Sequence, residues 1–152
     1  DEAEIIAIYF MGLLHDIGKI GIRDDIINKT SKLTDEEFMV IKNHPTIGYN
    51  ILKNMTEIPN IEYGARWHHE RYDGKGYPDG LKGEQIPEYA RIICVADAYD
   101  AMTSTRSYRA VMSQEKVRNE IENCKGKQFD PIIAQIMIEM IDEDINYKMK
   151  EK

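Results

Sequence analysis

The sequence is poor in cysteine, in long apolar runs and in excess positive charge. Its 152 residues include only two cysteines, too few for the disulfide framework of a small secreted domain, so we expect a reducing, cytoplasmic environment. No stretch approaches the roughly 20 consecutive apolar residues that span a bilayer. With 27 acidic and 20 basic side chains the net charge is -7, so no general field attracts nucleic acid or an acidic membrane surface. An anionic substrate would therefore need local cations, either metal ions or a few placed basic side chains.

The sequence also lacks the pattern of β-strands. Its apolar residues recur at helical rather than alternating spacing, and no two strand-like runs are joined by a hairpin turn. Its length is close to the commonest size of a single domain. We therefore predict an all-α fold, a compact multi-helix bundle with one Gly/Pro-rich loop, in which residues 1–145 form the domain and residues 146–152 a polar C-terminal tail.

Capping signals and prolines predict where the helices begin and end. The first helix is expected from about Ala3 to Lys19. Thr34 and Glu37 have the spacing of a capping box, which opens a helix, and His44-Pro45 opens the next because proline fits the first helical turn. A short turn is expected near residues 24–27, and the remaining helices over residues 60–69 and 88–103, after Ser113 and after Asp130.

The segment between Arg71 and Pro87 is rich in residues that break regular structure. Glycine frees the backbone and proline removes a hydrogen-bond donor, so this segment is predicted to be a structured loop or a mobile lid. The breakers are Gly74, Gly76, Pro78, Gly80 and Gly83.

Histidine is scarce and unevenly placed. The four histidines are His15, which precedes Asp16, then His44 at a helix boundary, and the adjacent pair His68 and His69. Imidazole and carboxylate together suit manganese, iron or zinc. Alone, His15-Asp16 fits a surface or capping role and His44 a helix-boundary role, whereas two consecutive imidazoles at a helix end are hard to bury without a metal or hydrogen-bond acceptors.

Two further charged residues have positions that fit the same chemistry. Asp97 lies between apolar neighbours in a predicted helix and would be costly to bury unpaired, so it forms either an interhelical salt bridge or a metal ligand. Lys19 follows His15 by four residues and Asp16 by three, which places all three on neighbouring positions of a helix. An ammonium group there could hold a phosphate oxygen over the metals.

Arg106 and Arg109 are spaced three residues apart. On a turn or a helix, this spacing lets both guanidinium groups face one anion. The alternative is that they pair with Asp97 or Asp100. The sequence therefore leaves both a phosphate-binding role and a structural role open for these two arginines.

Taken in order, these motifs closely resemble the HD-GYP family of the HD phosphohydrolase superfamily. The most specific string is HHERYDGKGYP, from His68 to Pro78. The resemblance covers nearly the whole chain and implies an all-α bundle, two iron or manganese ions, and the bacterial second messenger cyclic di-GMP as substrate. The other matching segments are His15-Asp16-Ile17-Gly18-Lys19, His44, Ala90-Arg91-Ile92, Val95-Ala96-Asp97 and residues 100–109.

The resemblance also implies a role for each candidate residue. Asp16 is the bridging, catalytic carboxylate, and Lys19 is the catalytic cation that contacts the phosphate. Arg106 and Arg109 are further phosphate contacts, and Tyr77-Pro78 borders the substrate pocket. The implied metal ligands are His15, Asp16, His44, His68, His69 and Asp97.

The implied reaction is hydrolysis of a phosphodiester bond. A pair of divalent ions about 3.5–4 Å apart lowers the pKa of a bridging water and clamps the scissile phosphate, while Lys19 stabilises the transition state. The product would be linear pGpG, or GMP after a second cleavage.

Members of the HD-GYP family carry a further helix upstream, with a histidine and in some members a glutamate that complete the metal site. Neither is present in this sequence, so we expect an N-terminally truncated domain and no third metal. In the parent protein, a sensory or receiver domain is expected upstream. The Gly/Pro-rich loop is expected to meet diguanylate cyclase (GGDEF) proteins.

Two other functions are open. One is a phosphohydrolase of the wider HD superfamily that acts on mononucleotides, against which the Tyr77-Pro78 loop, Arg106 and Arg109 argue. The other is a catalytically inactive module that binds cyclic di-GMP through an incomplete site. Metal content together with turnover of cyclic di-GMP separates these functions.

Overall fold

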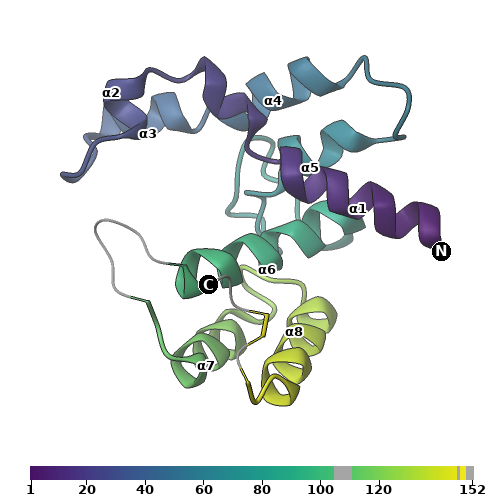
Figure 1. Cartoon of the computed structure of the whole chain (residues 1–152). Coiled ribbons are helices and arrows are strands. Elements are labelled where there is room, and N and C mark those ends of the chain that lie inside the picture. Colours follow the sequence, from purple (N-terminus) through teal and green to yellow (C-terminus); the bar gives the residue numbers. More distant parts are fainter. Residues whose placement is uncertain (105–110, 147, 150–152) are drawn as a thin grey trace.

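The computed structural model describes residues 1–104, 111–146 and 148–149, and these residues form helices without any strand (Figure 1). An isolated bridge joins Lys125 and Phe129 in the turn before the last helix. The prediction of an all-α fold is confirmed. Arg106 and Arg109, which we expected to contact phosphate, lie outside the described residues. No helix in the described ranges is long and apolar enough to cross a bilayer.

Two short 3₁₀ helices, η1 and η2, interrupt the series of α-helices. In chain order the elements are α1 (Glu2–Leu14), η1 (Ile17–Gly21), α2 (Asp24–Ile27), α3 (Asp35–Ile41), α4 (His44–Leu52), α5 (Ile61–Trp67), η2 (Gly83–Gln85), α6 (Glu88–Thr103), α7 (Gln114–Cys124) and α8 (Pro131–Glu143).

Several predicted helix starts are confirmed by the side chains that cap them. The hydroxyl of Thr34 accepts a hydrogen bond from Glu37 N at 3.2 Å, and the Glu37 carboxylate accepts one from Thr34 N at 2.8 Å. Pro45 lies in the first turn of α4. Ser113 and Asp130 cap the starts of α7 and α8. Each of these boundaries follows from a local signal in the sequence.

The first helix is shorter than predicted. It ends at Leu14 instead of continuing to Lys19, and after a two-residue break the chain winds as the 3₁₀ helix η1. The reason is a tertiary contact, because Gly18 packs so closely on α4 that a β-carbon there would overlap the carbonyl oxygen of His44. The break leaves the His15-Asp16 motif at a junction between two elements.

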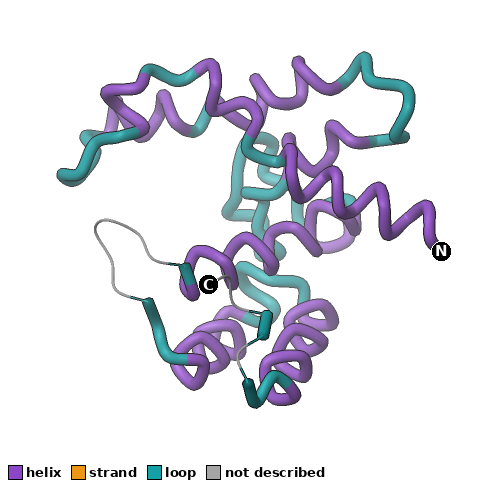
Figure 2. The backbone as a smooth tube through the Cα atoms, viewed as in Figure 1, coloured by secondary structure: helices purple, strands orange, loops and turns teal. Residues whose placement is uncertain are grey.

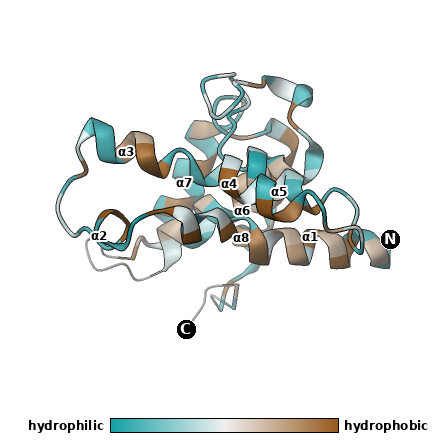
Figure 3. Ribbon diagram, turned by 90° about the horizontal axis from the view of Figure 1, so that it is seen from above, coloured by the Kyte–Doolittle hydropathy of each residue, from teal (hydrophilic) through white to brown (hydrophobic). Residues whose placement is uncertain are grey.

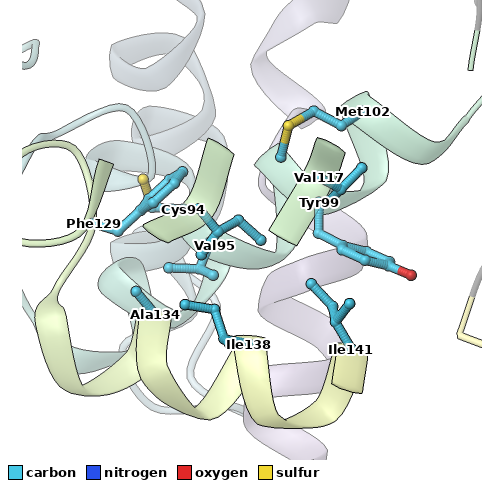
Figure 4. Packing of buried hydrophobic residues seen from close by; sticks show 10 residues of the cluster. Cys94, Val95, Tyr99, Met102, Val117, Phe129, Ala134, Ile138 and Ile141 are labelled. Atoms are coloured by element: carbon cyan, nitrogen blue, oxygen red, sulfur yellow. The ribbon is translucent and has the colours of Figure 1, made fainter. Parts of the chain in front are cut away.

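The helix α6 lies between two apolar cores (Figure 1). The first core joins α6 to α1, α4 and α5, and its buried members are Met11, Leu52, Ile61, Ala65 and Ile93. The second core joins α6 to α7 and α8 (Figure 4), and its buried members are Cys94, Val95, Tyr99, Met102, Val117, Ile121, Phe129, Ala134, Ile138 and Ile141. Cys94 is thus the small buried residue that its apolar neighbours predicted.

The helix α1 contributes to the core through a narrow stripe. Met11 is fully buried, whereas Ile5, Tyr9 and Leu13 are 68%, 62% and 60% exposed. Figure 3 shows the hydrophobic colour along this helix. The packed face of α1 is therefore the one that reaches α5 and α6.

The Gly/Pro-rich segment between α5 and α6 is mostly loop (Figure 2), and backbone hydrogen bonds hold it in place. Tyr72 N donates to Gln128 O at 3.1 Å, and Asp73 N donates to Lys127 O at 2.8 Å. These bonds fasten the loop to the turn between α7 and α8. Of the two predicted alternatives, the hydrogen bonds favour the structured loop.

Candidate metal centre

The candidate residues lie mainly at the ends of helices. His15 follows α1, Asp16 precedes η1, His44 is the first residue of α4, and His68-His69 follow α5. One ligand atom from each of Asp16, His44, His68 and His69 lies within 4.8 Å of the others. Chain junctions from separate parts of the sequence therefore meet at one point.

Three of the imidazoles are oriented by a hydrogen bond from Nδ1 to a backbone carbonyl. A carbonyl oxygen only accepts, so Nδ1 carries the proton and Nε2 presents a lone pair. This is the arrangement that orients histidine ligands in metal sites. The pairs are His15 with Gly12 at 2.6 Å, His44 with Ile41 at 2.7 Å, and His68 with Gly64 at 2.9 Å.

The lone pairs of His44 and His68 meet. Their Nε2 atoms are 3.3 Å apart, and neither can donate a hydrogen bond because each ring carries its proton on Nδ1. Asp16 Oδ1 adds a third acceptor, 3.2 Å from His44 Nε2 and 3.8 Å from His68 Nε2. Such converging acceptors repel one another unless a cation lies among them. Imidazole nitrogen together with carboxylate oxygen fits a divalent transition metal.

His15 and Asp97 form a second group at the other oxygen of Asp16. His15 Nε2 lies 3.5 Å from Asp16 Oδ2 and 3.6 Å from Asp97 Oδ1, beyond the usual hydrogen-bond range. This nitrogen is buried and has no hydrogen-bond partner in the described part of the chain. An orphaned nitrogen beside two carboxylates fits a second cation, with Asp16 between the two positions.

Burial sets the protonation of the histidine pair. Burial lowers the pKa of His68 to about 3 and that of His69 to about 4, so both rings are neutral near pH 7. Burial also lowers the pKa of His15, but Asp97, the Gly12 carbonyl and the charge of Asp16 together raise it above its ordinary value. A ligand imidazole must be neutral to bind a cation, which is the form that His68 and His69 hold.

The carboxylates of the centre are held in the ionised form. Burial alone would raise the pKa of Asp16, but the neighbouring His44 ring and the Lys19 ammonium group hold it well below its usual range. Burial likewise opposes ionisation of Asp97, and the neighbouring His15 lowers its pKa. Asp97 Oδ1 lies 3.6 Å from His15 Nε2, at the end of another helix, so this contact fits both roles expected for Asp97, the interhelical salt bridge with a protonated His15 and the metal ligand.

Lys19 lies beside the centre and faces an open cavity. Its Nζ donates a hydrogen bond to Asp16 Oδ2 at 2.5 Å, and its side chain is 44% exposed. Lys19 lines a cavity of about 530 Å³, whose apolar lining includes Ile22, just after η1, Ile26 and Ile27 of α2, and Ile41 of α3. The ammonium group is therefore both next to the candidate ligands and reachable from solvent.

Tyr77 covers His69. The two rings are stacked, with centroids 4.9 Å apart and planes inclined by 22°, and Lys42 Nζ lies 4.8 Å from the Tyr77 centroid. Burial raises the pKa of Tyr77 to about 12, so its hydroxyl stays protonated. The Tyr77-Pro78 peptide bond is cis.

A second cavity, of about 380 Å³, opens between α6, α7 and the loop, and we call it the α6–α7 cavity. Tyr77 lines it together with His68, His69 and Asp97, whereas Pro78 does not. Of the two residues expected to border the substrate pocket, Tyr77 is therefore the one beside the candidate ligands.

Glu70 is a buried residue beside the candidate ligands to which the sequence motifs gave no role. It is 2% exposed, and its carboxylate accepts three backbone hydrogen bonds, from Asp79 N at 2.7 Å, Gly80 N at 3.0 Å and Leu81 N at 3.0 Å. Asp79 in turn accepts two hydrogen bonds from Arg66. The sequence did contain one indication of this role. Glu70 lies between the histidine pair and a glycine-rich loop whose backbone amides need hydrogen-bond acceptors.

The fold and the donor set define the class to which the chain belongs. The sequence profile of the HD domain family matches residues 1–133, so the chain belongs to the HD domain family. HD-domain phosphohydrolases bind divalent metal ions, and the His/Asp cluster of this chain fits such ions.

Known relatives define the branch of the family. A cyclic di-GMP phosphodiesterase of Thermotoga maritima is 42% identical over 99% of this chain and 42% of its own length. The cyclic di-GMP phosphodiesterase response regulator RpfG of Xanthomonas campestris pv. campestris is 44% identical over 86% of this chain and 35% of its own length. The resemblance to the HD-GYP family is confirmed. The chain spans less than half the length of these relatives.

A solved structure shares the fold. It is that of a cyclic GMP-AMP specific phosphodiesterase of V. cholerae, V-cGAP3, with a TM-score of 0.67 and 21% identity, covering 95% of this chain and 40% of that chain. This likeness shows the arrangement of helices.

Proposed function

We propose that the chain is the catalytic part of a metal-dependent phosphodiesterase that hydrolyses cyclic di-GMP to linear pGpG and, by a second cleavage, to GMP. The observation that carries the proposal is the convergence of acceptor atoms from His44, His68 and Asp16, which needs a cation. Both relatives described above are named as cyclic di-GMP phosphodiesterases.

The chemistry of the donors assigns the ligands to two positions. His44, His68 and His69 would hold one divalent ion with Asp16 Oδ1, since their ligand atoms lie within 4.8 Å of one another. His15 and Asp97 would hold the other with Asp16 Oδ2. We propose iron or manganese, which accept this mixed set of nitrogen and oxygen ligands. Two such ions supply charge neutralisation at the phosphate and an activated water.

The remaining groups bind and orient the substrate. Lys19 is anchored by Asp16 and is partly exposed, so it can donate a hydrogen bond to a phosphate oxygen whose charge grows in the transition state. Tyr77 covers His69 and excludes water from that side. We keep Arg106 and Arg109 as proposed phosphate contacts, and the loop of residues 71–87 as the proposed contact for diguanylate cyclase (GGDEF) proteins.

The decisive test is turnover of cyclic di-GMP, measured by separating substrate, pGpG and GMP after incubation with Mn²⁺ or Fe²⁺ and after removal of metal by a chelator. We expect hydrolysis that the chelator abolishes and that added metal restores. Lys19→Ala should keep its metal and lose turnover by roughly 100-fold or more, whereas the exposed control Lys53→Ala should behave as the wild type.

The same assay separates the alternatives. Wild-type activity in Lys19→Ala would contradict the role of Lys19. Preferential cleavage of mononucleotides would indicate a phosphohydrolase of the wider superfamily. Binding of cyclic di-GMP without turnover under any metal would indicate the non-catalytic module and would contradict the proposed function.

A further inference from the structure

The α6–α7 cavity adjoins the candidate metal centre. His68, His69 and Asp97 line one part of it, and Glu120 and Gln128, from α7 and the turn after it, line another. Its volume of about 380 Å³ falls in the range of small-molecule sites, about 300–1,000 Å³. A phosphodiester bound at the centre could therefore place an attached group in this cavity.

The cavity has an apolar wall. Its apolar lining comes from Ala98, Ala101 and Met102 on α6 and from Phe129 before α8. Apolar surface of this kind suits the face of a nucleobase, whose edge is then read by polar groups at the rim. The apolar part of the α6–α7 cavity thus suits the face of a nucleobase.

Glu120, which lines the cavity, supplies an acceptor. Its carboxylate forms no ion pair among the described residues, and its contact is the weak one with the Cys124 thiol, whose Sγ lies 3.7 Å from Oε1. An anion beside the binding site of a negatively charged phosphodiester is unfavourable unless it accepts hydrogen bonds from the ligand. Glu120 therefore fits a ligand edge that carries N–H donors.

Gln128, which also lines the cavity, supplies a donor. Its Oε1 accepts a hydrogen bond from Arg71 Nη1 at 3.3 Å. Arginine can only donate, so this contact fixes which way the amide faces and leaves the NH₂ group of Gln128 directed elsewhere. Within the described part of the chain that NH₂ group has no acceptor. The cavity therefore offers a carboxylate acceptor and an amide donor together.

We propose that the α6–α7 cavity is a subsite that selects a guanine base of the substrate. This assignment rests on the proposed function. The Watson–Crick edge of guanine carries two neighbouring donors, N1–H and N2–H, which match the Glu120 carboxylate, and an acceptor, O6, which matches the Gln128 amide. Adenine would turn its N1 lone pair toward Glu120 and its amino group toward Gln128. Both contacts would be mismatched.

The proteins similar to this chain are named for cyclic dinucleotides that differ in one base. The two relatives are named for cyclic di-GMP, and the solved structure is named for cyclic GMP-AMP. A site that hydrogen-bonds to one base and leaves polar groups unpaired with another discriminates strongly between them. Glu120 and Gln128 are placed to make this distinction for one of the two bases.

The test compares Glu120→Gln with the matched control Glu122→Gln, which lies on the same helix outside the cavity. The kcat/KM values for cyclic di-GMP and cyclic di-AMP are measured with Mn²⁺ supplied, alongside metal content and helical circular dichroism. We expect the wild type and Glu122→Gln to prefer cyclic di-GMP. Glu120→Gln should lower kcat/KM for cyclic di-GMP by roughly ten- to a hundredfold and raise that for cyclic di-AMP, since a glutamine amide can pair with the adenine edge.

The outcomes distinguish this proposal from the proposed function. An unchanged ratio of the two kcat/KM values in an active Glu120→Gln enzyme would overturn the guanine subsite and leave the phosphodiesterase intact. If the wild type cleaves no cyclic dinucleotide, the proposed function fails, and calorimetric titration with GMP and AMP tests the subsite alone. Preference for GMP that Glu120→Gln removes would support it, and equal affinity of the wild type for both would overturn it.

Discussion

Backbone carbonyls, rather than other side chains, aim the imidazoles of the candidate centre. The carbonyls of Gly12, Ile41 and Gly64 hold the rings of His15, His44 and His68 by Nδ1. Each carbonyl belongs to the same turn as its histidine, so the helix end itself sets the direction of Nε2. Partners of this kind typically change metal affinity by ten- to a hundredfold when they are lost.

Glu70 fixes the position of the loop, as the backbone carbonyls fix the imidazole rings. Its two carboxylate oxygens take up three amides of residues 79–81, which would otherwise be unpaired beside a buried group. Because Glu70 directly follows His69, the loop and the ligand pair are tied to one short segment. The position of Tyr77 over His69 depends on this arrangement.

Glu70→Gln should therefore loosen the loop. An amide presents NH₂ where the carboxylate presented an oxygen, so at least one loop N–H loses its acceptor, at a cost of about 1–3 kcal/mol. Denaturant unfolding should show this loss of stability. The exposed control Glu84→Gln, in η2, should be unchanged within about 0.5 kcal/mol. Equal stability of Glu70→Gln and the wild type would show that the three hydrogen bonds do not hold the loop.

At the scale of elements, the centre depends on where helices stop. The chain leaves α1 at Leu14 and winds as η1 because Gly18 must lie against the start of α4. This contact sets Asp16 next to His44, with Oδ1 and Nε2 3.2 Å apart. A side chain at position 18 would separate the two elements.

Gly18→Ala should therefore damage the metal centre, whereas Gly12→Ala should not. A β-carbon at Gly18 meets the backbone of His44, while one at Gly12 meets nothing within 4 Å. We expect Gly18→Ala to lose about 1–3 kcal/mol of stability and roughly ten- to a hundredfold in metal affinity. Gly12→Ala should gain about 0.5–1 kcal/mol, since it lies inside a helix. Metal titration and denaturant unfolding measure both effects, and wild-type affinity in Gly18→Ala would contradict the packing argument.

The fold was predictable wherever a local signal sets it. The capping box of Thr34 and Glu37, the proline at the start of α4 and the Asp130 cap all act within one helical turn, so the sequence alone predicts them. The end of α1 was missed because it depends on Gly18 meeting α4, a contact between segments that only the folded chain brings together. Apolar periodicity continued past Leu14 and gave no sign of the break.

The sequence allowed the residues of the candidate site to be predicted, but not their positions relative to one another. The motifs named the histidines and aspartates that meet in the structure, and their role as ligands stays a prediction. The resemblance implied that Asp16 bridges two ions, but not which side chain each oxygen faces: Oδ1 lies toward His44 and Oδ2 toward His15. Glu70 was missed because its three partners are backbone amides, which carry no signature in the sequence.

At the scale of the whole molecule, α6 connects the candidate centre to both cores. Asp97 faces His15, while Val95 and Tyr99 on the same helix pack in the second core. Arg91, also on α6, forms an ion pair with the buried Asp130 that caps α8. The helices on the two sides of α6 are thus held to one element.

Because the overall charge is -7, binding of an anionic substrate depends on local cations. A negatively charged cyclic dinucleotide meets a repulsive field at a distance, so its binding must come from charge concentrated at one place. Two divalent ions and Lys19 would provide that charge. Binding of such a substrate therefore depends most on whether metal occupies the candidate centre.

Anomalous X-ray diffraction from crystals grown with Mn²⁺ or Fe²⁺ tests this claim most directly. We expect one peak within about 2.0–2.3 Å of the ligand atoms of His44, His68 and Asp16, and a second between His15 and Asp97. His68→Ala should lose the first peak. The absence of both peaks from an active enzyme, or metal bound elsewhere while this cluster stays empty, would contradict the assignment of metal to the candidate centre.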